Sequence, residues 1–258
     1  MRMDRRRALV LLGLGAAAPA TGARARGAPS FQHGVASGDP LQDRVMLWTR
    51  ITARGSDDVA YRWMLDPVDR KGGGKRGSGV TGADRDFTVK VDVTNLDPGR
   101  AYNFQFEAGG VKSPVGRTRT LPDGPTKDAV LAVCTCALYP NGYFNAYGAI
   151  AKLARVDAVV HLGDYIYEYG GSGSYGMDSP VAGERPHDPS HECVSLADYR
   201  RRHAQYKTDP QLQAAHARAP WIVVWDDHET ANDSWIGGAE NHQPATEGDW
   251  NVRKAAAI

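Results

Sequence analysis

The stretch DAVVHLGDYIYEYG, residues 157–170, passes from an apolar run straight into an acid and a series of tyrosines. The apolar half predicts a buried strand, because short apolar runs are typical of strands covered on both faces. Asp164 stands at the carboxyl end of that strand, and tyrosines follow at positions 165, 167 and 169. Tyrosines pack well and hydrogen-bond at strand ends, so the pattern has a structural explanation. The other explanation is that Asp164 and one of the tyrosines hold a metal ion.

Two more stretches end in the same way. AVLAVCTC (129–136) predicts a strand that ends in two cysteines, and WIVVWDDHE (221–229) predicts a strand that ends in two acids, a histidine and a glutamate. Apolar residues at helical spacing predict helices between the strands, at 143–156, from Ser195 onward and at 210–219. Strands joined by helices imply parallel β-α-β units, and ligands gather at the carboxyl ends of such strands. The three strand ends therefore predict one common site.

The residues at these ends indicate metal chemistry. Carboxylates and phenolates are oxygen donors suited to ferric iron, calcium or magnesium, and a thiolate beside them indicates a transition metal such as iron. A carboxylate on the middle strand could bridge two metals, which would polarise a phosphate and convert water to a hydroxide nucleophile. The histidine of the third end could stabilise developing charge or protonate the leaving oxygen.

Several of these residues also have ordinary structural explanations. Cys134 alone is more typical of a buried structural cysteine, and His161, inside the apolar strand, of a histidine satisfied in the core. Tyr165 and Tyr169 are expected to pack. The chain has three cysteines, an odd number, so at least one is free, intermolecular or a ligand. A bridge between Cys134 and Cys136 would be strained, because they stand two residues apart in one strand.

The first 27 residues predict an export signal. A basic start with Arg5, Arg6 and Arg7, a short apolar stretch and a small-residue cleavage site resemble a twin-arginine signal, with an ordinary secretory signal as the alternative. The protein is therefore expected to be periplasmic or secreted and to meet the twin-arginine export machinery. The apolar stretch is too short for a stable membrane span. A net charge of +1 and scattered basic residues give no reason to expect nucleic-acid binding.

Residues 30–122 predict a small all-β sandwich of the immunoglobulin or fibronectin type. The segment from Leu96 to Tyr102 has the spacing of a tyrosine corner, in which Tyr102 bonds back across the turn at Pro98 and Gly99. RKGGGKRGSG (70–79) predicts a flexible, basic hairpin tip or loop. The alternative is that these strands extend the next domain rather than form a unit of their own.

Residues 128–258 follow a linker rich in proline and predict the α/β part. Ser195 and Asp198 have the form of a capping box that opens a helix, with Leu196, Tyr199, His203 and Tyr206 on one face. The stretch 170–194, rich in Gly, Ser and Pro, predicts a long loop, and loops of that length are usually functional or mobile.

At these residues the sequence resembles the alkaline phosphatase D family, whose relatives include phosphodiesterases and phospholipase D-like enzymes of the metallophosphoesterase fold. The resemblance runs from about residue 31 to the end and rests on GVASGDPLQDRVMLWTR, CALYPNGYFNAY, HLGDYIYEYG, DYRRRHAQYKTDPQLQAAHARAPWIVVWDDHETANDSW and GAENH. Gly163-Asp164 matches one metal motif of that fold, and the segment from Asp226 to Glu229 takes the place of its G-N-H-[DE] motif.

The resemblance implies an exported phosphatase or phosphodiesterase with ferric iron and calcium, although another divalent ion could fill the second site. Cys136 and Tyr167 would bind the iron, and Asp164 would bridge iron and calcium. Asp227 would bind calcium, and His228 would contact the phosphate and act in catalysis. Among these roles, only metal binding at Asp164 and Asp227 follows from the residues without the family.

The sequence ends in NVRKAAAI, within a helical pattern, where members of the family continue for a long stretch that carries further metal ligands. We therefore expect an incomplete metallophosphoesterase α/β sandwich, with an exposed sheet edge and apolar surface, and no activity of this chain alone. Two other functions remain open: a phospholipase D-like phosphodiesterase, and a non-catalytic exported protein that binds partners as a scaffold.

Overall fold

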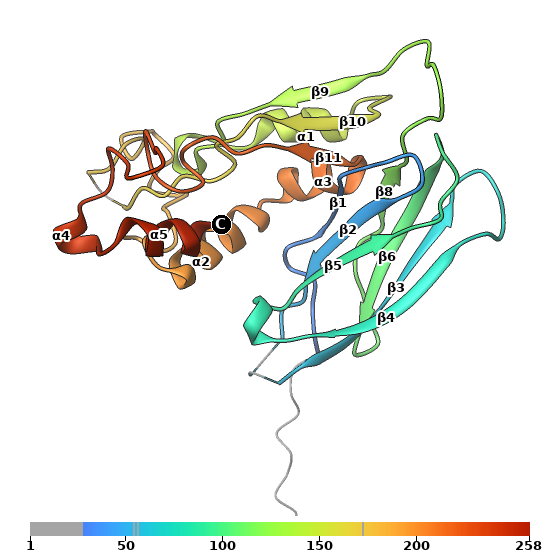
Figure 1. Ribbon diagram of the computed structural model, residues 1–258, viewed down its shortest axis with the longest axis horizontal. Helices are drawn as coiled ribbons and strands as arrows, with labels where there is room; N and C mark the ends of the chain where they lie inside the picture. Colours follow the sequence, from blue (N-terminus) through green and yellow to red (C-terminus); the bar gives the residue numbers. More distant parts are fainter. Residues whose placement is uncertain (1–27, 54, 56, 172) are drawn as a thin grey trace, which may run out of the picture.

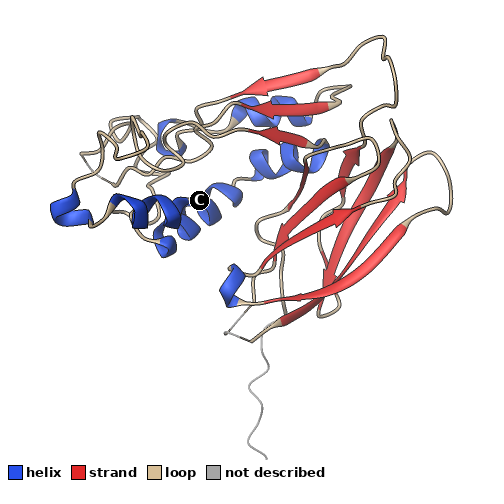
Figure 2. Ribbon diagram, in the orientation of Figure 1, coloured by secondary structure: helices blue, strands red, loops and turns tan. Residues whose placement is uncertain are grey.

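The computed structural model describes residues 28–53, 55, 57–171 and 173–258, and the expected export signal lies outside this part of the chain. The described chain contains two β-sheets, with the α-helices gathered on one side of the molecule (Figures 1 and 2). One sheet has five strands: β3 (Val59–Pro67), β4 (Lys75–Thr81), β6 (Ala101–Ala108), β7 (Val111–Lys112) and β8 (Gly116–Arg119). The other has six: β1 (Val35–Gly38), β2 (Val45–Arg50), β5 (Thr88–Val93), β9 (Leu131–Cys134), β10 (Ala158–His161) and β11 (Trp221–Val223). A short 3-10 helix (Ala83–Arg85) lies between β4 and β5.

The six-stranded sheet runs through both predicted parts of the chain, in the order β5-β2-β1-β11-β10-β9. Strands β5, β2 and β1 pair antiparallel, whereas β11, β10 and β9 pair parallel. The two halves meet where β1 pairs parallel with β11, through Gly38 and Trp221. Gly38 fits there because a side chain would lie about 3.0 Å from the Trp221 carbonyl oxygen. The domain division at 122–128 stays a prediction, since this sheet crosses it.

The strands of residues 30–122 form two sheets around a shared core, as predicted for a β-sandwich, but one of these sheets continues into β11, β10 and β9. Alternate residues of β2, β5 and β6 point into a shared core that includes Leu47, Val89 and Phe106, as expected for strands with one buried face. The tyrosine corner is also confirmed: the backbone N–H of Asp97 donates to the Tyr102 hydroxyl at 2.9 Å, and Tyr102 is buried. This bond fixes the turn between β5 and β6.

The parallel strands have one covered face and one open face. Helices α1 (Asn145–Ala151) and α3 (Pro210–Arg218) contribute Tyr147 and Leu212 to a core with Val159 and Trp221. On the opposite face, large apolar side chains are exposed: Leu131 (52%), Val133 (61%) and Ile222 (40%). Strand β9 is an edge of the sheet. The expected open edge and apolar surface are therefore confirmed.

The remaining helices are α2 (Leu196–Lys207), α4 (Pro244–Glu247) and α5 (Trp250–Ala257). The capping box of α2 is confirmed, because the Ser195 hydroxyl accepts from the Asp198 N–H while the Asp198 carboxylate accepts from the Ser195 N–H. Its predicted apolar face is only partly right: Leu196 is exposed, and Arg202 is fully buried instead. In the described part of the chain, no helix combines the length and apolar character needed to cross a membrane.

Candidate metal centre

Asp164 occupies a tight turn at the end of β10. The backbone of Asp164 is in the left-handed region (φ 54°), directly after Gly163 at φ 100°. A Cβ at Gly163 would lie 2.3 Å from the backbone nitrogen of Asp226, so only glycine lets the two strand ends approach this closely. The loop after β9 is tied to the same turn, since the Ala137 N–H donates to the Asp164 carbonyl at 2.8 Å.

One oxygen of Asp164 meets two of the predicted ligands. The Tyr167 hydroxyl donates to Oδ2 at 3.1 Å, and the Cys136 thiol approaches the same oxygen at 3.4 Å. The other oxygen, Oδ1, is buried and has no hydrogen-bond partner among the described residues. An unpaired buried carboxylate oxygen is costly, and cation binding is one of the few ways to satisfy it.

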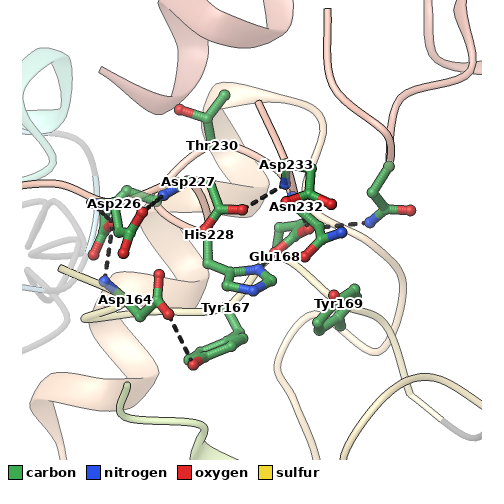
Figure 3. A network of polar contacts seen from close by, with 12 residues as sticks. Asp164, Tyr167, Glu168, Tyr169, Asp226, Asp227, His228, Thr230, Asn232 and Asp233 are labelled. Carbon is green, nitrogen blue, oxygen red and sulfur yellow. Dashed lines mark hydrogen bonds and ion pairs between the residues drawn. The ribbon is translucent and has the colours of Figure 1, made fainter. Parts of the chain in front are cut away.

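Asp227 and His228 arrive from the third strand end. Strand β11 itself ends at Val223, and an extended segment carries the chain on to the acids. Ligand atoms of Asp164, Asp227 and His228 all lie within 4.8 Å of one another (Figure 3). All five predicted site residues, from Cys136 to His228, are thus gathered at the carboxyl ends of β9, β10 and β11.

Glu229 joins the second and third ends through the backbone. Its carboxylate accepts from the N–H groups of Asp164 at 3.2 Å, Tyr165 at 2.5 Å and Asp226 at 2.9 Å. Burial raises the pKa of Glu229, although these hydrogen bonds favour its charged form and oppose the shift. Glu229 is therefore a support that holds the turn of Asp164 against the segment of Asp227.

His228 is held by a residue that the sequence did not single out. Its Nδ1 lies 2.8 Å from Oε2 of Glu168, and its ring stacks on Tyr167 with centroids 4.2 Å apart. Burial alone would lower the pKa of His228, but the hydrogen bond and charge of Glu168, with Asp227 and Asp164, raise it overall. In the sequence, Glu168 stands out only as an acid within a run of tyrosines. Its partners His228 and Asn232 lie 60 or more residues away, so no local spacing links them to Glu168.

The environment of Tyr167 disfavours a free phenolate. Burial, followed by the negative charges of Asp164 and Cys136, raises the pKa of Tyr167 far above its usual value. A cation at this point would supply the opposite charge that a phenolate requires. A thiol, a phenol and carboxylates converge here, and this donor set fits ferric iron beside an oxygen-ligated divalent ion.

The structural explanations given for the neighbouring residues are confirmed. His161 is fully buried, within 2.9 Å of the Tyr147 hydroxyl, and Tyr165 is buried with its hydroxyl 2.9 Å from His216 Nε2. Tyr169 packs against the rings of Tyr167 and His228. All three cysteines are free; Cys134 packs at the border of the core but is only half-buried, not fully buried as expected.

Comparisons with known proteins agree with this arrangement. The family model "PhoD-like phosphatase" matches residues 131–258, and "PhoD-like phosphatase, N-terminal domain" matches residues 16–122. The chain is 40% identical over 214 residues to alkaline phosphatase D of Bacillus subtilis (strain 168), over 79% of this chain and 36% of that protein. The solved structure of PhoD superposes with a TM-score of 0.79 at 37% identity, over 88% of this chain and 44% of that one.

The chain thus spans less than half the length of these relatives. Together the two family models cover the β-sandwich and the parallel strands with their site. The model of the N-terminal domain matches first along the chain, and the phosphatase model follows it. The chain belongs to the PhoD-like phosphatase family.

Proposed function

We propose that the protein is an exported metal-dependent phosphohydrolase that cleaves phosphate monoesters or diesters. The observation that carries this proposal is the convergence of Cys136, Tyr167 and Asp227 on Asp164, one oxygen of which is buried without a partner. Family membership supports the same reaction class.

Four side chains would hold the metal ions. Cys136 and Tyr167 would bind ferric iron, Asp227 would bind calcium, and Asp164 would bind both. Bound cations polarise a phosphate ester and lower the pKa of water, so that water can act as the nucleophile. The protein contributes the spacing, because the shared oxygen of Asp164 lies within 3.4 Å of both iron-binding candidates.

His228 would contact the phosphate rather than hold the iron. Its Nδ1 is occupied by Glu168, which leaves Nε2 as the atom able to donate to an oxygen of the ester. The Tyr167 ring beneath it limits rotation. Nε2 would stabilise the charge that develops on the phosphate or give a proton to the leaving oxygen.

Export through a twin-arginine signal is part of the proposal and rests on the sequence of the first 27 residues. That route carries proteins that are already folded, which suits an enzyme that acquires its metal before it leaves the cytoplasm. Fusion of this segment to a reporter protein, with Arg6 and Arg7 replaced by lysine, would show whether export depends on the arginine pair.

Hydrolysis of a nitrophenyl phosphate monoester and of the corresponding diester tests the reaction. We expect no release of nitrophenol by residues 1–258 alone. A protein that also carries the further metal ligands implied by the family resemblance should release nitrophenol with iron and calcium, and should lose that activity with chelator and in Asp164→Asn. Activity that resists chelator, or that persists in Asp164→Asn, would contradict the proposal. A protein that binds both metals but hydrolyses neither ester would favour a binding or scaffold function.

A further inference from the structure

Glu168 is the only acid in the tyrosine run that follows Asp164, and it is fully buried. Its Oε2 accepts from Nδ1 of His228 at 2.8 Å. Its Oε1 accepts from the backbone N–H of Asn232 at 2.7 Å and from the side chain of Asn241 at 3.0 Å. Both oxygens are therefore satisfied, as a buried carboxylate requires.

We propose that Glu168 is the positioning residue of His228: it holds the proton of the ring on Nδ1 and turns Nε2 toward the space beside Asp164 and Asp227. This inference rests on the proposed function, in which His228 meets the phosphate. A carboxylate only accepts hydrogen bonds, so the ring nitrogen that faces Glu168 must carry a proton. The imidazole is then fixed by one hydrogen bond at its edge and by the Tyr167 ring at its face.

Glu168 is itself fixed by a longer chain of contacts. Asn241, which donates to Glu168, also donates to Glu192 at 2.9 Å. Glu192 in turn accepts from Arg253 of α5 at 2.7 Å, and Arg253 is fully buried. Through Glu168, Asn241 and Glu192, the orientation of His228 is thus linked to the loop 232–241 and to α5.

A purely structural role is the competing explanation, because Glu168 also anchors the loop through Asn232 and Asn241. The two explanations differ in what Glu168→Gln should do. The carbonyl oxygen of glutamine can keep the contacts with Asn232 and Asn241, which places its NH₂ group against Nδ1 of His228. That NH₂ group donates, so the ring proton must move to Nε2.

The first readout is the position of the ring proton in the metal-free chain, from the ¹⁵N chemical shifts of His228. We expect Nδ1 to be protonated in the wild type and unprotonated in Glu168→Gln, with Glu192→Gln unchanged. Glu192→Gln is the matched control, because Glu192 shares the Asn241 contact but does not touch His228. An unprotonated Nδ1 in the wild type, or a protonated Nδ1 in Glu168→Gln, would overturn the proposal.

The second readout is the affinity of the chain, loaded with iron and calcium, for inorganic phosphate. We expect Glu168→Gln and His228→Asn each to weaken binding by about tenfold, and the double variant to bind no worse than either one. Additive losses, or an equal loss in Glu192→Gln, would show an anchoring role and overturn the proposal. Thermal unfolding of each variant identifies losses caused by misfolding.

A wild type that binds both metals but no phosphate would overturn the proposed function, whereas the proton position tests the Glu168 contact by itself.

Discussion

The hydroxyl of Tyr167 lies 3.1 Å from Oδ2 of Asp164, three residues earlier in the same turn. The contact forms where Asp164 adopts a left-handed backbone just after β10. The thiol of Cys136 reaches the same oxygen from the neighbouring strand. A single carboxylate oxygen is thus the meeting point of two residues that can bind iron.

Tyr167→Phe should abolish the visible absorption that arises when a phenolate donates charge to ferric iron, and should weaken iron binding about 10- to 100-fold. Absorption spectra during titration with iron check this. Tyr169→Phe is the matched control, because Tyr169 packs against the rings of Tyr167 and His228 but, among the described residues, its hydroxyl makes no hydrogen bond to Asp164. An unchanged spectrum in Tyr167→Phe would remove Tyr167 from the site.

Gly163→Ala should destabilise the protein by about 2–4 kcal/mol and weaken metal binding, because it adds a strained φ and a contact of 2.3 Å with Asp226. Urea unfolding gives the free energy change. Gly183→Ala is the control, since a Cβ there meets nothing within 4 Å. Equal stabilities of the two variants would mean that the strand ends can separate without cost.

Tyr102→Phe should cost about 1 kcal/mol of unfolding free energy, because the N–H of Asp97 loses its partner at 2.9 Å in a half-buried turn. The same urea experiment measures it. Tyr61→Phe serves for comparison, because its hydroxyl makes no hydrogen bond among the described residues of the chain. A loss in Tyr102→Phe no greater than in Tyr61→Phe would mean that the corner adds no stability.

Asp198→Asn should lower stability by about 1 kcal/mol at pH 7 through the capping box of α2. Burial raises the pKa of Asp198, but hydrogen bonds from Ser195, His191 and Val194 outweigh it and lower the pKa to about 2. Since the unfolded value is about 3.9, the stabilisation is complete above about pH 5 and is lost as the pH falls toward 2.

The difference between wild type and Asp198→Asn should therefore shrink to nearly nothing at pH 2, as measured by thermal unfolding at several pH values. A difference that stays constant across this range would mean that the charge of Asp198 does not contribute.

Local patterns made much of this structure predictable. The tyrosine corner and the capping box depend on residues three to six positions apart, so their spacing in the sequence determines their bonds. The shared site at three strand ends followed from topology alone, because parallel strands bring their carboxyl ends to one edge.

Contacts between distant segments were less predictable. RKGGGKRGSG was expected to be a hairpin tip or loop; its first half does connect the antiparallel strands β3 and β4, but its second half belongs to β4 itself. Glycine is suited there because a Cβ at Gly77 would lie 2.5 Å from the Trp63 indole. Leu196 was expected on the buried face of α2 but is exposed. Arg202, which the sequence pattern did not single out, is fully buried, because backbone carbonyls of Tyr167, Asp188 and Pro189 accept from its guanidinium.

One pair of cations is proposed to bind where Cys136, Asp164, Tyr167 and Asp227 meet. Elemental analysis of the purified protein, before and after dialysis with iron and calcium, tests it most directly when wild type is compared with Asp164→Asn and with the exposed-site control Asp123→Asn. We predict that wild type and Asp123→Asn retain both metals and that Asp164→Asn loses both. Retention of iron and calcium by Asp164→Asn at the wild-type ratio would contradict the account.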